Sequence, residues 1–143
     1  MMVPVELREI QIVDDARREQ IVVLGEREGK RVFPIVIGLT EAAAMDSAVR
    51  NQVHQRPLTH DLILNAISEL GGRIIEVQID DLRDSTFYGK LAVENVAGKR
   101  VLVDSRPSDA LVLAMKLRVP IFVADHVLDA VAEEPRNPMS APE

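Results

Sequence analysis

Short apolar segments that alternate with polar residues recur along this chain, and mostly short polar turns separate them. Ile75, Val77 and Ile79, for example, alternate with charged or amide side chains. A period of two residues places one set of side chains in a core and the other in solvent, as in a half-buried β-strand. This pattern predicts strands at 5–12, 75–79 and 87–93, and short, largely apolar runs predict strands at 21–24, 32–37, 100–104 and 121–123. Because the connections are short, we expect a mostly antiparallel or mixed β-sheet.

Two local features refine this expectation. In the first strand the apolar parity switches across Arg8-Glu9, which predicts a bulge or a change of buried face. The polar run 81–85 predicts a turn between the strands on either side of it.

Apolar residues at helical spacing mark about four further segments. We expect helices at 41–51 after a cap at Thr40, at 107–117, and from a cap at Asp125 to about 134. Another helix opens near Thr59 and ends at Gly71-Gly72. Its predicted buried stripe consists of Leu62, Ile63, Ala66, Ile67 and Leu70. Three strands followed by a helix occur twice, so the fold class is α+β with a possible internal β-β-β-α duplication.

Length and composition indicate one domain. The chain has 143 residues, of which 47% are hydrophobic and 28% charged, as in ordinary globular domains. We assign residues 1–134 to the domain and residues 135–143, which carry three prolines and no apolar period, to a disordered tail. The chain has no cysteine, no apolar run of membrane-spanning length and no secretory signal pattern, so we expect a cytoplasmic protein with no membrane partner.

Charge and aromatic content limit how the chain could hold nucleic acid. A formal net charge of −6 argues against a broad electrostatic grip on phosphates. Three Phe and one Tyr are too few for a base-stacking platform spanning several nucleotides. Glycine-rich phosphate loops and the common hydrolase motifs are absent from the sequence. A nucleic-acid site would therefore need a metal ion or a local arginine cluster.

The densest polar cluster is the run from Asp104 to Asp109, at a predicted strand-to-helix turn. Capping explains much of it: Ser105 or Arg106 takes the cap position, Pro107 starts the helix, and Asp109 falls in the first turn, where negative charge is favoured. Asp104 is more than capping requires. Two close carboxylates either hold a divalent cation through their oxygens or form a structural clamp on Arg106.

A second polar cluster, from Arg56 to Asp61, also opens a helix. In a purely structural interpretation Thr59 is the cap and Asp61 interacts with the helix dipole. His60 beside a cap is more often a surface or hydrogen-bonded group than a metal ligand, although it could transfer a proton.

Four sequence blocks together resemble the bifunctional nuclease domain family. They are Arg56-Pro57-Leu58-Thr59-His60-Asp61-Leu62, Ser85-Thr86-Phe87-Tyr88-Gly89-Lys90-Leu91, Asp104-Ser105-Arg106-Pro107-Ser108-Asp109-Ala110 and Pro120-Ile121-Phe122-Val123-Ala124-Asp125. The resemblance runs from about residue 3 to 128 and keeps the order and spacing of the blocks. The family is named for activity on RNA and DNA in some plant members. The resemblance implies a compact α+β fold, self-association as a dimer or trimer, and site residues in the first and third blocks.

Two functions follow, with roles assigned from chemistry. The leading hypothesis is a metal-dependent nuclease in which Asp104 and Asp109, with Asp61, hold Mg²⁺ or Mn²⁺. Arg56 and Arg106 would clamp the phosphate of the nucleic-acid substrate, and His60 would deliver or take a proton; Asp109 would also belong to the catalytic group. The alternative is a non-enzymatic oligomeric module whose Arg–Asp clusters are structural or bind an anion or a protein partner.

Overall fold

A computed structural model describes residues 1–11 and 19–132 of the chain. These residues form seven strands and four helices, which confirms the α+β class. In chain order the elements are β1 (Met2–Gln11), β2 (Glu19–Glu26), β3 (Val32–Gly38), α1 (Leu39–Val49), α2 (Thr59–Glu69), β4 (Arg73–Arg83), β5 (Thr86–Glu94), β6 (Arg100–Ser105), α3 (Pro107–Leu117), β7 (Ile121–Ala124) and α4 (Asp125–Ala132). The predicted tail at 135–143 and the last residues of the predicted final helix lie outside the described residues.

The strands form one mixed sheet in the order β3-β2-β1-β7-β4-β5-β6. Neighbouring strands are antiparallel except β4 and β7, which are parallel. Two antiparallel meanders, β1-β2-β3 and β4-β5-β6, therefore lie on either side of β7, and each meander leads directly into a helix. This arrangement repeats the β-β-β-α order expected from the sequence.

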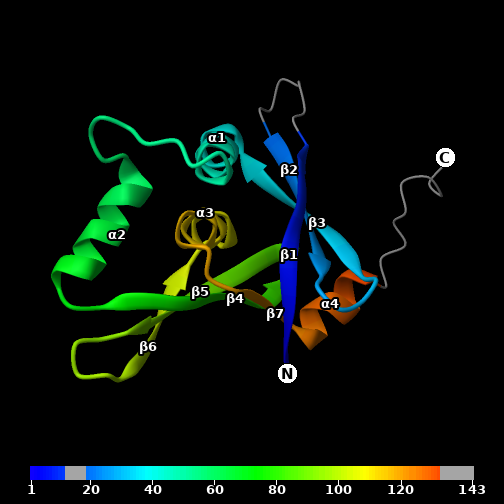
Figure 1. The fold of residues 1–143 in the computed structure, drawn as a ribbon. Helices are drawn as coiled ribbons and strands as arrows, with labels where there is room; N and C mark the ends of the chain where they lie inside the picture. The colour runs from blue at the N-terminus through cyan, green and yellow to red at the C-terminus, as the bar shows by residue number, and fades with distance from the viewer. Residues whose placement is uncertain (12–18, 133–143) are drawn as a thin grey trace.

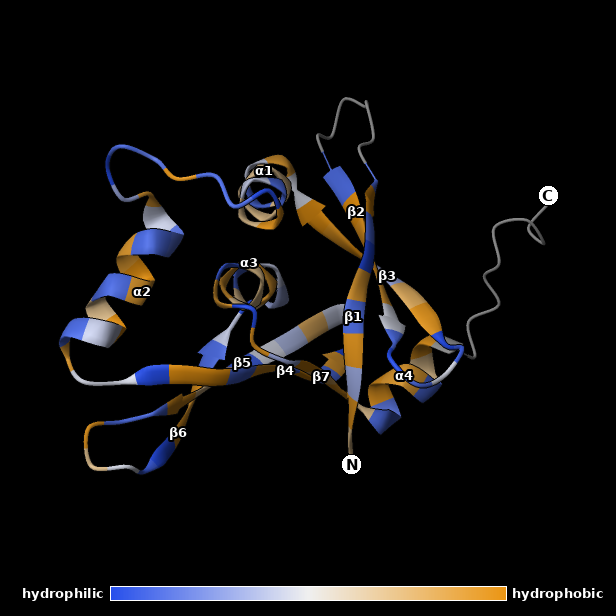
Figure 2. Cartoon of the chain, in the orientation of Figure 1, coloured by the Kyte–Doolittle hydropathy of each residue, from blue (hydrophilic) through white to orange (hydrophobic). Residues whose placement is uncertain are grey.

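The helices cover the sheet from both sides (Figure 1). Helices α1 and α3 lie side by side, α4 packs near β3, β4 and β7, and α2 stands apart at one end of the molecule. Figure 2 shows apolar positions along the strands and in α3, and many of these residues pack together in one core. Leu111, Val112 and Leu113 of α3 are almost completely buried in this core, as are Phe33 of β3 and Met45 of α1. The position of α3 is therefore fixed on several sides.

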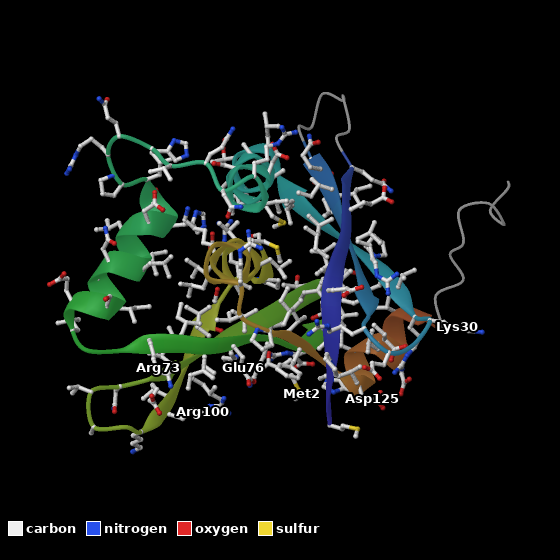
Figure 3. The ribbon with its side chains drawn as sticks, in the orientation of Figure 1. Met2, Lys30, Arg73, Glu76, Arg100 and Asp125 are labelled. Carbon is white, nitrogen blue, oxygen red and sulfur yellow. The ribbon has the colours of Figure 1, made fainter. Side chains whose placement is uncertain are left out.

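The sheet surface turned away from α1 and α3 carries charged side chains (Figure 3). Arg100 donates to Glu76 at 3.2 Å, and Arg73 donates to Glu94 at 3.1 Å. These pairs tie β4 to β5 and β6 in partly solvated surroundings.

The structure corrects three predicted helix caps. The predicted caps Thr40, Thr59 and Asp125 instead lie inside α1, α2 and α4. Gly38 and Leu58 are the residues that precede the helical turns of α1 and α2, and neither uses a side-chain cap. Composition favours Ser, Thr and Asp near a helix start without fixing the exact position, because they are also favourable one or two residues inside the first turn.

The predicted buried stripe of α2 is confirmed only in part, at Ile63 and Ile67. None of its residues is fully buried, Leu62 is 61% exposed, and Leu70, just beyond the helix, is 80% exposed. The residues that do pack against the core are Ile63, Leu64 and Ile67. Because α2 touches α3 and β4 along only one narrow side, periodicity alone overestimates its buried face.

The predicted bulge in the first strand is confirmed by a register shift between Leu7 and Glu9. A shift between Ile74 and Glu76 turns Ile74 into the core, in place of the predicted Ile75. The turn predicted at 81–85 is shorter than expected. Strand pairing continues to Arg83, and only Asp84 and Ser85, both with positive φ, form the loop, as in the tight turns that match strand twist.

Among the described residues, no helix has the length and apolar character needed to cross a membrane.

Candidate functional site

Side-chain contacts join the start of α1 to the start of α3 and the end of α1 to the end of α3. The two helices therefore run parallel. Arg106, the residue before α3, donates to Glu41 of α1 at 3.1 Å. At the other end Arg118 donates to Asn51 at 2.9 Å. The positive ends of both helix dipoles therefore lie together.

His60 brings the start of α2 to the same place. Its Nε2 lies 2.9 Å from Oδ1 of Asp109, in the first turn of α3. Arg106 holds the same carboxylate with two nitrogens, Nε to Oδ2 at 2.9 Å and Nη2 to Oδ1 at 3.1 Å. We call Glu41, His60, Arg106 and Asp109 the helix-start cluster.

Burial differs within the helix-start cluster. The side chain of His60 is 13% exposed, that of Glu41 20% and that of Asp109 28%, whereas Arg106 is 63% exposed. Arg106 is thus the group that solvent or a ligand reaches first. The other three side chains are more buried. Glu41 and Asp109 contact Arg106 directly, and His60 contacts Asp109.

Hydrogen bonds and ion pairing keep Asp109 and Arg106 charged. Burial raises the pKa of Asp109, but hydrogen bonds from Arg106 and His60 more than offset it, so this pKa lies below its ordinary value. Hydrogen bonds to Asp109 and then to Glu41 raise the pKa of the Arg106 guanidinium. Arg106 and Asp109 therefore form an ion pair across the neutral pH range.

The close approach of β5 to the start of α3 requires a residue without a side chain. A Cβ atom on Gly89 would lie 3.1 Å from the carbonyl oxygen of Ser105, 3.2 Å from that of Gln78 and 3.4 Å from Cα of Pro107. All three contacts are backbone atoms, which cannot move aside independently. Gly89 therefore helps fix the turn that carries Arg106.

The sequence-predicted residues divide into separate groups in the structure. His60, Arg106 and Asp109 come together as predicted for catalytic groups. Arg56 lies in the exposed segment before α2 and has no ion-pair partner among the described residues.

The three carboxylates predicted as metal ligands do not come together. Asp61 binds Lys116 at 2.8 Å and accepts the backbone N–H of Leu58, and these contacts hold its pKa below the ordinary value. Asp104 is 82% exposed and lies 3.5 Å from Lys90, while Asp109 belongs to the helix-start cluster. Within the described part of the chain, no group of three or more His, Cys, Asp or Glu side chains is arranged to hold a metal ion. The donor set expected for Mg²⁺ or Mn²⁺ is therefore not assembled among the described residues.

The sequence matches the model of the bifunctional nuclease domain over residues 22–136. The chain belongs to this family. An uncharacterized protein of Mycobacterium tuberculosis (strain H37Rv) is 39% identical over 124 residues, which are 86% of this chain and 73% of that protein. Bifunctional nuclease 1 of Oryza sativa subsp. indica is 25% identical over 118 residues, which are 81% of this chain but only 36% of the rice protein. These matches confirm the resemblance drawn from the four sequence blocks.

Sequence reasoning missed two partners in this bifunctional nuclease domain. Glu41, the second carboxylate on Arg106, has the ordinary sequence signal of an acidic residue in a first helical turn. Lys116, the partner of Asp61, has no local signal, because the contact joins α2 to the last turn of α3. Only the packing of the helices shows that these charges meet.

The domain also has an open groove of about 490 Å³ at the opposite ends of α1 and α3. Val49, Arg118 and Ile121 are among its lining residues. Because eleven-residue helices are about 16 Å long, this groove is well separated from the helix-start cluster.

Proposed function

We propose that this domain hydrolyses phosphodiester bonds of nucleic acid at the helix-start cluster. The observation that carries the proposal is the bond between His60 and Asp109, 49 residues apart in the sequence, beside the exposed guanidinium of Arg106. Family membership and the nuclease names of the rice relatives support the same reaction class.

Each group of the cluster has a role that its contacts support. Asp109 accepts from His60 Nε2 and from Arg106, so it fixes the orientation of both side chains. His60 takes a proton from the attacking water or hydroxyl, or returns one to the leaving oxygen. Arg106 contacts the non-bridging phosphate oxygens and stabilises the charge that grows on them in the transition state.

The helix starts offset part of the negative charge of Glu41 and Asp109, the two carboxylates that pair with Arg106. Glu41, His60 and Asp109 lie in the first turns of α1, α2 and α3, so the positive ends of three helix dipoles converge there. Arg56, without an ion-pair partner among the described residues, offers a second cation for a neighbouring phosphate. The proposed substrate contact is local and needs no extended basic surface.

Dependence on Mg²⁺ or Mn²⁺ stays a prediction of the sequence. None of the roles assigned to His60, Arg106 and Asp109 passes through a metal ion. Chelation therefore separates two versions of the proposal, cleavage by the cluster itself and cleavage that needs an added ion.

A non-enzymatic module is the second candidate. Arg106 already binds both Glu41 and Asp109, as expected of a clamp that locks two helix starts together. In that case the cluster contributes to stability and not to catalysis.

The test uses the purified protein with single-stranded RNA and single-stranded DNA, with Mg²⁺, with Mn²⁺ and with a chelator. We expect cleavage by the parent and a loss of at least about 100-fold in rate for His60→Ala, as for other general acid–base residues. His126→Ala is the matched control, because His126 is exposed and pairs with Asp81, which is not part of the cluster. Absence of cleavage under all conditions would favour the non-enzymatic module, and equal rates for both variants would show that His60 does not act in the reaction.

A further inference from the structure

The free edge of β6 has an apolar surface that edge strands usually avoid. β6 is the last strand of the sheet, and Val101, Leu102 and Val103 are 39%, 52% and 43% exposed. Unprotected apolar edges invite pairing with another strand, and most proteins block them with proline, charge or a covering element. The opposite edge strand, β3, carries Pro34 at its centre.

The hydrogen-bond pattern shows which groups of β6 point outward. The β5–β6 turn closes with the Asn95 N–H donating to the Lys99 carbonyl at 2.8 Å. In an antiparallel pair, bonded and non-bonded positions alternate from there, so Val101 and Val103 face β5 with their backbone groups. The N–H and C=O groups of Arg100, Leu102 and Asp104 are therefore directed to the open edge.

We propose that β6 pairs antiparallel with β6 of a second copy of this chain, about a two-fold axis at Leu102. Leu102 then lies opposite Leu102 of the second copy, and Arg100 lies opposite Asp104 of the second copy. In this register all outward backbone groups of the three residues meet a partner. The pairing joins the two sheets into one and gives a dimer, the smaller of the two assemblies expected from the sequence.

Side-chain charge favours a second copy over an unrelated strand. Arg100 and Asp104 share one face of β6, are 50% and 82% exposed, and have opposite charge at equal distance from Leu102. A two-fold interface needs such self-complementarity, and here the favourable pair occurs twice. On the other face Val101 lies opposite Val103 of the second copy.

Strand pairing alone buries less than the roughly 1,200 Å² of a stable interface, so further surface is needed. Figure 1 places α2 at the same end of the molecule as β6. A Cβ atom on Gly71, just after α2, would lie 3.0 Å from the side chain of Val96 in the β5–β6 turn. Leu70 and Val96 are each 80% exposed near this contact and supply additional apolar area.

The first experiment is a cross-link. The chain has no cysteine, so Leu102→Cys introduces a single thiol. Cα atoms of a hydrogen-bonded antiparallel pair lie about 5.5 Å apart, which suits a disulfide. Under mild oxidation we expect Leu102→Cys to form a covalent dimer, and the control Val53→Cys, 94% exposed in the segment between α1 and α2, to form it at least about tenfold more slowly. Equal rates would contradict the register.

The second experiment exchanges the charges and measures sedimentation velocity. Arg100→Glu and Asp104→Arg each place like charges across the edge and should shift the dimer to monomer. The double variant restores opposite charges between copies but not the contacts with Glu76 and Lys90 inside each chain, so its dimer should return. Circular dichroism checks that all variants fold. A monomeric parent, dimeric single variants or a monomeric double variant would overturn the proposal, whether or not the domain cleaves nucleic acid.

Discussion

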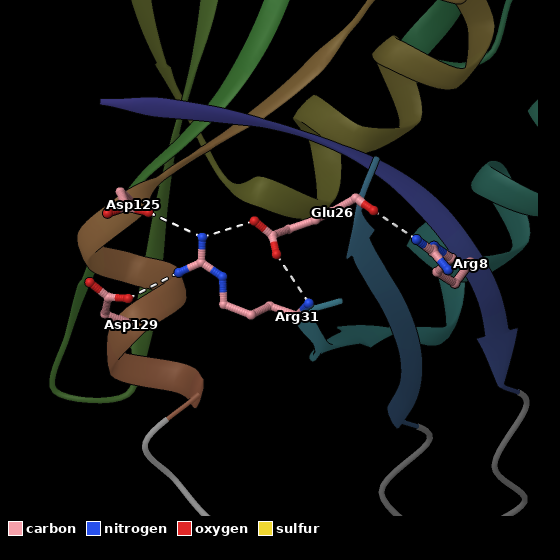
Figure 4. Close-up of polar contacts among 5 residues, drawn as sticks. All are labelled: Arg8, Glu26, Arg31, Asp125 and Asp129. Carbon is pink, nitrogen blue, oxygen red and sulfur yellow. Dashed lines mark hydrogen bonds and ion pairs between the residues drawn. The ribbon is translucent and has the colours of Figure 1, made fainter. Parts of the chain in front are cut away.

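Arg31 and Arg106 are each held by more than one carboxylate, yet their surroundings differ. Arg31 donates to Glu26 at 2.8 Å, to Asp125 at 3.2 Å and to Asp129 at 3.0 Å, and thereby ties α4 to the β2–β3 turn (Figure 4). It is 32% exposed, and hydrogen bonding to Glu26 is the main cause of its raised pKa. No histidine belongs to this group of described residues. Two of the guanidinium contacts join the β2–β3 turn to α4, and the contact with Glu26 closes the turn itself.

Arg106 is twice as exposed, at 63%, and shares its carboxylate with His60. The Arg31 group has what a structural tie needs, whereas the helix-start cluster adds a titratable group and an accessible cation. Similar residue types in two places thus indicate different roles. Matched substitutions in the two groups test that distinction.

The largest expected effect is on catalysis. Arg106→Lys keeps the charge but loses the planar two-nitrogen contact with Asp109, so we expect the cleavage rate to fall by about 100-fold. Arg31→Lys makes the same change in the other group and should leave the rate within about twofold. Rates on single-stranded RNA and DNA check both variants, and similar losses in the two would contradict the distinction.

Gly89→Ala tests the support beneath Arg106. The added methyl group meets backbone atoms of Gln78, Ser105 and Pro107, so either the strands or the start of α3 must shift. We expect a loss of about 1–3 kcal/mol in the free energy of unfolding, as for other overpacked sites. Gly98→Ala is unsuitable as a control because its φ is +80°, whereas Ala92→Gly changes β5 without adding atoms. Denaturant titration measures the difference between the parent and the variants.

Acid should weaken the helix-start cluster in a defined direction. The pKa of Asp109 is below its ordinary value of 3.8, so its contribution to stability is present above that pH and is lost as pH falls through the lower folded-state value. Asp109→Asn should reduce stability by about 1 kcal/mol at pH 7, after allowance for partial exposure, and by less at pH 3. Thermal unfolding across this pH range checks the sign, and a loss that grows in acid would contradict it.

The smallest effect is expected for Asp104→Asn. The carboxylate is 82% exposed and lies 3.5 Å from Lys90, so Tm should change by no more than about 2 °C. Melting the parent and the variant with and without Mg²⁺ or Mn²⁺ also tests the predicted metal role. If the ion stabilises the parent but not Asp104→Asn, and if Asp104→Asn also loses cleavage, then Asp104 is a metal ligand.

Local patterns in the sequence by themselves determined most of the secondary structure. Alternation and short apolar runs together identified the seven strands. The parity switch at Arg8-Glu9 located the bulge, because a strand exposes its two faces with a fixed period. Pro107 fixed the start of α3 for a local reason as well, since its ring sets φ near the helical value. The polar blocks also pointed to His60, Arg106 and Asp109 before any contact was known.

Only the tertiary structure decided which of these polar groups meet. The bond from His60 to Asp109, the contact of Glu41 with Arg106 and the pairing of Asp61 with Lys116 all join different helices. Sequence composition favours acidic residues at every helix start, so it could not separate Asp109, in the cluster, from Asp104, exposed on the edge strand. Their surroundings depend on the sheet order and on the parallel packing of α1 and α3, which are set by long-range contacts and leave no periodic signal in the chain.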